Sequence, residues 1–195
     1  MCAHIMPIKM KELVLSQEEI SVIVKRLGAE LTRDLSGEKV PPVFLCVMKG
    51  ALPFYADLIK EIKIDIACDY LQLTSYGGGL SSTGTVRLDK DVAAQLDDRV
   101  VVIVEDIVDT GLSMKFLLEH IHARFKPKKV IVCALFDKEI ARKVPVKVDY
   151  VGMKLEEAKF LVGYGLDYKE LLRNIPYVYV PTEDEIAALD ALFDD

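Results

Sequence analysis

The sequence predicts an α/β protein built on a doubly wound, mostly parallel sheet flanked by helices. Two observations predict this fold class. Short apolar runs at 43–47, 100–104 and 129–136 alternate along the chain with segments of helical periodicity, which is typical of parallel strands joined by helices. The run at 100–104 is β-branched throughout, as in a central strand whose two faces are both covered.

The other elements follow from local patterns. Ser16, with Glu19 three residues later, forms a capping box, and apolar residues then recur at helical spacing, so we expect a helix at 16–35. The stretch 75–85 is rich in glycine and serine, which predicts a mobile loop. We further expect a helix at 53–62, a strand at 64–73, an undecided polar stretch at 88–98, a helix at 113–125, short strands near 150 and at 177–180, and a weakly helical acidic tail from 182.

Composition excludes several classes of protein. The 195 residues, 51% of them hydrophobic, suffice for one domain with a substantial core. A net charge of −6 argues against a general nucleic-acid binder, which needs a dense basic patch. No apolar stretch reaches the roughly 18 residues that cross a bilayer, the N-terminus lacks a secretory apolar block, and the cysteines form no Cys-x-x-Cys pair. We therefore expect a reduced, cytoplasmic protein without nucleic-acid or membrane partners.

An anion-binding turn is predicted where the strand at 100–104 leads toward the helix at 113–125. In an open α/β sheet, ligands bind beyond the carboxyl ends of the strands. The free N–H groups and the positive dipole end of the helix favour an anion there. Gly111 lets the backbone approach that anion closely, and the hydroxyls of Thr110 and Ser113 can add hydrogen bonds.

Three acids, Glu105, Asp106 and Asp109, follow the same strand. Carboxylates can accept from ribose hydroxyls or hold a divalent cation, so acids beside an anion site suit a phosphorylated sugar. The alternative is that Asp109 or Thr110 merely caps the helix. The adjacent Glu-Asp pair favours the ligand site, because neighbouring carboxylates repel each other unless a cation or ligand uses them.

This segment resembles the signature of type I phosphoribosyltransferases that binds 5-phosphoribosyl diphosphate (PRPP), and its form is similar to that of the hypoxanthine-guanine branch. The resemblance extends over about 40–180. It implies a single domain over 1–195, with a core at about 36–150 and a small hood from about 1–20 and 151–195. The implied enzyme is a Mg²⁺-dependent pentosyltransferase of purine salvage, a dimer or tetramer, that transfers the phosphoribosyl group of PRPP to N9 of hypoxanthine or guanine and yields IMP or GMP and pyrophosphate.

The resemblance also implies residue roles in the signature. Glu105 and Asp106 engage the ribose hydroxyls, partly through Mg²⁺. Asp109 lies near N7 of the purine and serves as general base. The 5′-phosphate is held by backbone groups of Asp109, Thr110, Gly111, Leu112 and Ser113, of which Leu112 stands where the family often has a different residue.

Two loops are assigned by the same resemblance. Met48, Lys49 and Gly50 resemble the pyrophosphate loop, in which the family often has a non-proline cis peptide between the positions of Met48 and Lys49. Ser75 and Tyr76 resemble the start of the flexible catalytic loop. A polar loop of this kind can close as a lid and keep water from an oxocarbenium-like sugar.

The same resemblance implies which residues contact the base, the magnesium and the pyrophosphate. Lys138 is expected to donate to O6 of the purine, which favours a 6-oxopurine because an ammonium group never accepts. Phe160 is expected to stack on the base, and the carbonyl of Leu161 to receive its N–H donors. Asp167 is expected to ligate magnesium, and the final residue of this set, Arg173, to contact pyrophosphate. The family commonly has alanine where Gly165 stands, a change that we expect to matter little.

Three alternatives compete with this hypothesis. One is a regulator that uses the same fold to sense PRPP or bind RNA, which the charge of −6 disfavours. Another is a sister enzyme for adenine, orotate, uracil or xanthine, against which Asp109, Lys138 and Phe160 together favour hypoxanthine and guanine. The third is a nucleotide-binding domain without catalysis, which leaves the acids and the loop at 75–85 unexplained.

Overall fold

The computed structural model describes residues 11–76 and 85–193. Its elements are β1 (Glu12–Leu15), α1 (Gln17–Leu35), β2 (Val43–Met48), α2 (Leu52–Glu61), β3 (Ala67–Tyr76), β4 (Thr85–Lys90), β5 (Val100–Val108), α3 (Leu112–Arg124), β6 (Lys129–Asp137), a 3₁₀ turn (Glu139–Ala141), β7 (Tyr150–Lys154), β8 (Val178–Val180) and α4 (Glu183–Asp190). Six strands form one sheet in the order β4-β3-β2-β5-β6-β7, in which only β4 runs antiparallel to its neighbour. The predicted fold class is confirmed.

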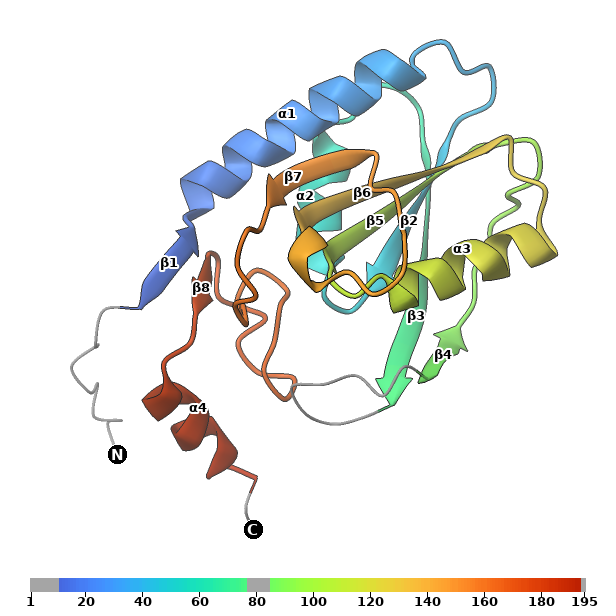
Figure 1. Cartoon of the computed structure of the whole chain (residues 1–195). Coiled ribbons are helices and arrows are strands. Elements are labelled where there is room, and N and C mark those ends of the chain that lie inside the picture. The colour runs from blue at the N-terminus through green and yellow to red at the C-terminus, as the bar shows by residue number, and fades with distance from the viewer. Residues whose placement is uncertain (1–10, 77–84, 194–195) are drawn as a thin grey trace.

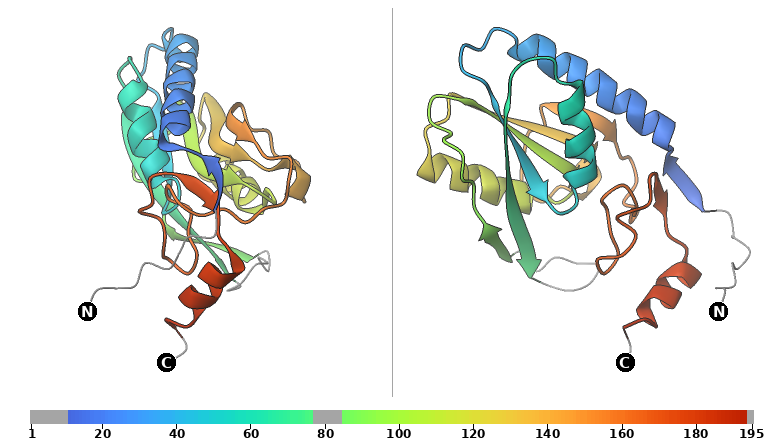
Figure 2. Two further views of the ribbon diagram at one scale, coloured as in Figure 1. Left: turned by 90° about the vertical axis from the view of Figure 1, so that its left-hand side faces the viewer. Right: turned by 180° about the vertical axis from the view of Figure 1, so that it is seen from behind.

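Helices cover both faces of this sheet, as Figures 1 and 2 show. Alternate residues of β5 explain the two layers. Val100, Val102 and Val104 pack with α1 and α2, whereas Val101 and Ile103 pack with α3. All five side chains are almost fully buried, so the β-branched run is a central strand, as the sequence predicted.

The capping box at the start of α1 is present. The Glu19 backbone N–H donates to the Ser16 hydroxyl at 3.1 Å, and the Ser16 N–H donates to the Glu19 carboxylate at 2.8 Å. These two bonds satisfy donors that the helix end would otherwise leave free. The apolar face of α1 then buries Ile20, Val24 and Leu27 against the sheet.

The hairpin of β3 and β4 differs from the expectation. β3 extends to Tyr76 and pairs antiparallel with β4 from Tyr76↔Thr85 to Gln72↔Lys90. The segment between the two strands is therefore shorter than the expected loop at 75–85. Its residues, 77–84, lie outside the described ranges. The sequence from 88 onward does not reveal its secondary structure, because an edge strand can carry polar residues and then shows little apolar alternation.

The two ends of the described chain meet in a second, two-stranded sheet, in which β1 pairs antiparallel with β8. An isolated bridge from Val162 to Tyr179 ties the segment after β7 to it. In Figure 1 this segment lies beside the carboxyl ends of β2 and β5. Within the part of the chain that is described, no helix is both long and apolar enough to span a membrane.

Candidate active site

The predicted site residues gather where β2, β5 and β6 end. Parallel pairing sets these ends side by side: Cys46 lies opposite Val104, and Val108 lies opposite Asp137. The turns that follow the three strands therefore share one edge of the sheet. The segment 159–173 approaches the same edge and contacts these turns through the pairs described below.

The turn after β5 leaves backbone N–H groups free at the start of α3. Gly111 is the N-cap of α3 with φ +83°, a conformation that favours glycine. Among the described residues, the N–H groups of Thr110, Gly111 and Ser113 have no hydrogen-bond acceptor. A cavity of about 80 Å³ lies here, lined by Glu105, Ile107, Val108, Asp109, Thr110, Gly111, Ser113 and Met114. Free amides at a helix start around a small cavity suit a phosphate group.

Helix capping does not account for the side chains of this turn. No side chain caps α3, because its N-cap is Gly111. The Asp109 carboxylate accepts no cap bond from the backbone of α3, and the Thr110 hydroxyl accepts only a long bond of 3.4 Å from the Leu112 N–H. The alternative that Asp109 or Thr110 merely caps the helix is thus wrong.

The two neighbouring acids at the end of β5 are buried. Glu105 and Asp106 are each 9% exposed. Burial raises the pKa of both carboxyls above the ordinary range, and repulsion from Asp106 raises the pKa of Glu105 further. Neither side chain forms an ion pair within the described chain; Asp106 accepts from the Ile107 N–H at 2.8 Å. Such a pair suits a hard cation that supplies the missing positive charge.

The third expected metal ligand, Asp167, is held apart from this pair. Its carboxylate accepts from the Arg173 guanidinium at 2.8 Å and from the Glu170 N–H at 2.8 Å. In the described ranges, no three acidic, histidine or cysteine side chains converge as a ready metal cluster. Magnesium commonly takes one or two carboxylates and completes its shell with water and substrate phosphates, so the arrangement fits ions that arrive with a diphosphate.

Asp109 and Lys138 lie together, as their expected roles require. Lys138 Nζ lies 3.6 Å from Asp109 Oδ2 and donates to the Lys159 carbonyl at 3.1 Å. The other carboxylate oxygen, Asp109 Oδ1, is buried and has no hydrogen-bond partner. A buried acceptor without a donor is costly, whereas the Asp109 side chain as a whole is 45% exposed and open to a ligand.

The turn after β2 contains the cis peptide between Met48 and Lys49 that the resemblance implied. Gly50 packs so closely that a Cβ on it would overlap the Asp106 carboxylate. Gly165 has φ +100°, and a Cβ there would overlap the Gly50 carbonyl. On this backbone both the space and the conformation at position 165 therefore favour glycine.

Arg173 spans the gap between these turns. It donates to the Gly165 carbonyl at 2.7 Å and pairs with Asp167 as described. Lys49, the other cation expected at the pyrophosphate, is exposed on the loop after β2. The two cations are thus close enough to share one anionic partner, which is Glu170.

The segment expected to bind the base lies next to Lys138. Phe160 is 38% exposed, and its ring meets Tyr168 edge to face with centroids 5.9 Å apart. Leu161 is buried, and none of the described donors reaches its carbonyl. An open aromatic face beside a free carbonyl and a lysine can hold a planar heterocycle.

Ser75 and Tyr76 end β3, the strand next to β2. Their backbone thus points toward the same edge of the sheet. Their side chains and the rest of the expected lid, 77–84, lie outside what the structure describes.

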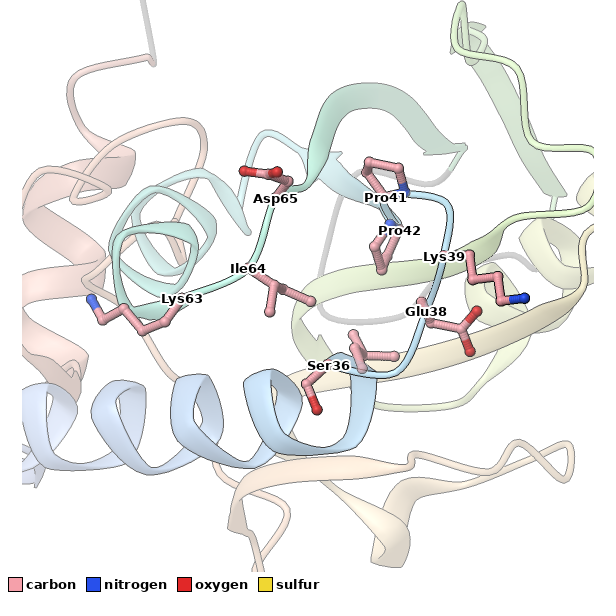
Figure 3. A pocket seen from close by; sticks show the side chains of 9 residues that line it. Ser36, Glu38, Lys39, Pro41, Pro42, Lys63, Ile64 and Asp65 are labelled. Atoms are coloured by element: carbon pink, nitrogen blue, oxygen red, sulfur yellow. The ribbon is translucent and has the colours of Figure 1, made fainter.

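A larger cavity, of about 510 Å³, lies at the opposite edge of the sheet (Figure 3). It is lined by residues that precede β2 and β3, among them Pro41, Pro42, Lys63 and Asp65. Ligands of open α/β sheets bind at the carboxyl ends of the strands, and none of the predicted site residues lines this cavity. Its size therefore does not mark the candidate site.

Two charged residues at the site escaped the sequence analysis. Glu170 bridges Lys49 at 3.1 Å and Arg173 at 3.2 Å, and the hydrogen bond from Lys49 lowers its pKa. Arg142 contacts the turn after β5. Its only sequence signal is its place four residues after Lys138.

Comparison with known proteins gives one consistent result. Residues 12–169 match the phosphoribosyl transferase domain family. A hypoxanthine-guanine phosphoribosyltransferase of Streptococcus thermophilus is 42% identical over 174 residues, 89% of this chain and 94% of the relative. A solved hypoxanthine phosphoribosyltransferase from Staphylococcus aureus has a TM-score of 0.82 and 39% identity, covering 90% of this chain and 93% of its own. A solved Trypanosoma cruzi hypoxanthine phosphoribosyl transferase, studied for the role of its C-terminal region in oligomeric state and activity, has a TM-score of 0.85 and 30% identity, covering 95% and 98%.

Proposed function

The chain belongs to the hypoxanthine-guanine phosphoribosyltransferases of the type I phosphoribosyltransferase family, and from that premise we propose how its own residues divide the work of the reaction. It is an enzyme of purine salvage. One observation carries the proposal: Asp109 lies beside Lys138, and one of its carboxylate oxygens is buried without a donor. Asp109 also belongs to the turn after β5, where backbone N–H groups have no acceptor among the described residues.

The 5′-phosphate of PRPP occupies the turn after β5. The N–H groups of Thr110, Gly111 and Ser113 donate to its oxygens, with Leu112 contributing its backbone to the same helix start. Binding at this turn places the ribose over Glu105 and Asp106, the two buried acids.

Magnesium use is general in this class of enzyme, and the acids of this chain fit the ion. Glu105 and Asp106 would hold it on the ribose side, and Asp167 on the pyrophosphate side. When bound, magnesium neutralises charge that develops on the departing pyrophosphate. Lys49, Arg173 and the amides around Gly50 supply the protein's share of that neutralisation.

The purine lies against Phe160, with Lys138 donating to O6 and the Leu161 carbonyl accepting from the base. The Asp109 carboxylate accepts or shares the N7 proton while N9 bonds to C1 of the ribose. The bond from C1 to the pyrophosphate oxygen breaks at the same centre, and the electron pair leaves with pyrophosphate. Adenine would present its amino group to the Lys138 donor, which the site rejects.

Further proposals concern the whole protein. The sheet core at about 36–150 and a hood from about 1–20 and 151–195 act as two parts of one domain, which the β1–β8 pairing supports.

A dimer or tetramer is inferred from the Trypanosoma cruzi relative and from exposed Leu192 and Phe193 after α4. Light scattering measures the molar mass in solution and tests this proposal. The free thiols of Cys46, Cys68 and Cys133 suit a reducing cytoplasm.

A panel of bases tests the function. The protein is incubated with PRPP, Mg²⁺ and one base at a time, and pyrophosphate release is followed. Hypoxanthine and guanine should support release, whereas adenine, orotate and uracil should not. Comparable rates with adenine would contradict the role of Lys138, and xanthine in the panel decides whether the site accepts a further 6-oxopurine.

A further inference from the structure

We propose that Arg142 is a positioning residue for this reaction: it grips the outer side of the turn after β5 and thereby aims the amides of that turn at the 5′-phosphate and fixes the backbone of Asp109. The proposal rests on the proposed function, since it assumes that this turn binds PRPP. Arg142 follows the 3₁₀ turn that comes after Lys138. It contacts the carbonyl side of the turn after β5, not the N–H groups or the carboxylates assigned to substrate above.

All three nitrogens of the Arg142 guanidinium group donate hydrogen bonds. Nε donates to the Asp109 carbonyl at 3.0 Å, and Nη2 donates to the Val108 carbonyl at 3.1 Å. Nη1 donates to the Val146 carbonyl at 2.8 Å. Nη2 also pairs with the Asp137 carboxylate. With the Arg142 side chain only 13% exposed, water competes little for these bonds.

The backbone after Arg142 completes this grip. The Lys143 N–H donates to the Thr110 carbonyl at 2.9 Å, and the Val144 N–H reaches the same oxygen at 3.3 Å. Three consecutive carbonyls, those of Val108, Asp109 and Thr110, are thus held by the segment 142–144.

This arrangement decides which way the amides face. In a planar trans peptide, the carbonyl of one residue and the N–H of the next point in opposite directions. Holding the carbonyls of 108, 109 and 110 toward Arg142 therefore turns the N–H groups of 109, 110 and 111 away from it. The N–H groups of Thr110 and Gly111 are among those without an acceptor in the described chain, as a concave anion site requires.

Arg142 also packs closely against Gly111. A Cβ on Gly111 would lie 2.8 Å from Cδ of Arg142 and 2.9 Å from the Val144 carbonyl oxygen. The side chain of Arg142 thus packs flat against the turn as well as bonding to it. Arginine is specific here, because a forked group with five donors can serve four acceptors at once, whereas a lysine ammonium cannot match that geometry.

Steady-state kinetics with Arg142→Ala and Arg142→Lys tests the proposal. We expect kcat/KM for PRPP to fall about 100-fold in Arg142→Ala, the loss that a displacement of about 1 Å can cause, with KM for hypoxanthine nearly unchanged. Arg142→Lys keeps the charge and should still lose most of this activity. Added guanidinium ion, far below denaturing concentrations, should restore kcat/KM for PRPP in Arg142→Ala in a saturable manner.

Arg99→Ala is the matched control. Arg99 also forks onto main-chain carbonyls, those of Pro41 and Gln95, but at the opposite edge of the sheet. It should keep PRPP kinetics and show no guanidinium rescue. If Arg142→Ala does not fold, Arg142→Lys with its thermal midpoint and its separate KM values for PRPP and base carries the test.

Two outcomes overturn the proposal while leaving the function intact: a folded Arg142→Ala with wild-type PRPP kinetics, or a loss that affects both substrates equally and does not respond to guanidinium. A wild-type protein that releases no pyrophosphate with any base would instead refute the proposed function itself.

Discussion

Asp109 shares one carboxylate oxygen with Lys138 and buries the other where none of the described donors reaches it. If the Asp109 carboxylate takes the N7 proton, Asp109→Asn removes the base that the step needs. We expect kcat to fall by about 10²–10⁴-fold while KM for PRPP stays within a few-fold, because in the proposed site backbone amides hold the phosphate. Pre-steady-state and steady-state assays measure both quantities, and near-normal turnover would show that the base is elsewhere.

Lys138 is the residue that we propose selects the base. Lys138→Met removes the donor to O6 and leaves a side chain of similar length. A lost hydrogen bond from a charged donor is worth about 1.5–3 kcal/mol, so kcat/KM for hypoxanthine should fall by about 10–100-fold and adenine should be rejected less strongly. The ratio of the two rates measures this, and an unchanged ratio would remove Lys138 from the recognition of O6.

Gly165 tests the contact between the hood and the turn after β2. Gly165→Ala places a methyl group against the Gly50 carbonyl at φ +100°, so we expect a loss of about 1–3 kcal/mol of stability and a higher KM for PRPP. Gly37→Ala is the control, since a Cβ at Gly37 meets nothing within 4 Å. Equal melting temperatures for the two variants would contradict the steric argument.

Among the elements, α1 has a start that a local pattern, the capping box of Ser16 and Glu19, determines. Ser16→Ala removes the hydroxyl that caps the helix and should lower the free energy of unfolding by about 1 kcal/mol. Ser36→Ala, at the exposed other end where the hydroxyl donates to the Arg33 carbonyl, should change it by less than about 0.5 kcal/mol. Urea unfolding measures both, and equal losses would mean that the capping box contributes nothing particular.

The other half of the capping box gives a pH dependence. The Ser16 N–H and hydroxyl, which bond to the Glu19 carboxylate, lower its pKa from 4.5. A lowered folded pKa means stability that is fully present above 4.5 and lost as the pH falls through the folded value. The stability difference between wild type and Glu19→Gln should therefore shrink below pH 4.5, and a constant difference across acid pH would contradict it.

Elements with a continuous pattern could be predicted from the sequence. The capping box of Ser16 fixed the start of α1, and the β-branched run fixed β5. The end of β3 and all of β4 could not be predicted, because pairing between distant edge residues such as Thr74 and Arg87 leaves no local period. The segment after β7 was likewise hidden, since Lys169 and Glu170 adopt positive φ without the glycine that normally announces it.

At the scale of the whole molecule, the site combines turns from four separate parts of the chain. Motifs suggest roles for the residues that match a family pattern, such as Asp109 and Phe160. They could not predict Arg142, whose bonds reach carbonyls 33 and 34 residues away, because such contacts exist only after the sheet has formed.

A site assembled in this way should couple ligand binding to global stability. PRPP with Mg²⁺ binds only the folded chain, and a ligand at 100 times its Kd adds about 2.7 kcal/mol. The melting temperature of the wild type should therefore rise with both present, and Asp106→Asn should reduce that rise. Asp65→Asn, beside the cavity at the opposite edge, should leave it unchanged; an equal effect of both variants would contradict the location of the site.

The pairing of β1 with β8 also orders events during synthesis. A ribosome releases the first strand long before its partner exists, and the residues around Asp167 and Arg173 emerge only shortly before that partner. The strands of the six-stranded sheet can therefore pair while the segment that holds Asp167 and Arg173 is still missing. The candidate site is completed at almost the same time as β8 becomes available to pair with β1.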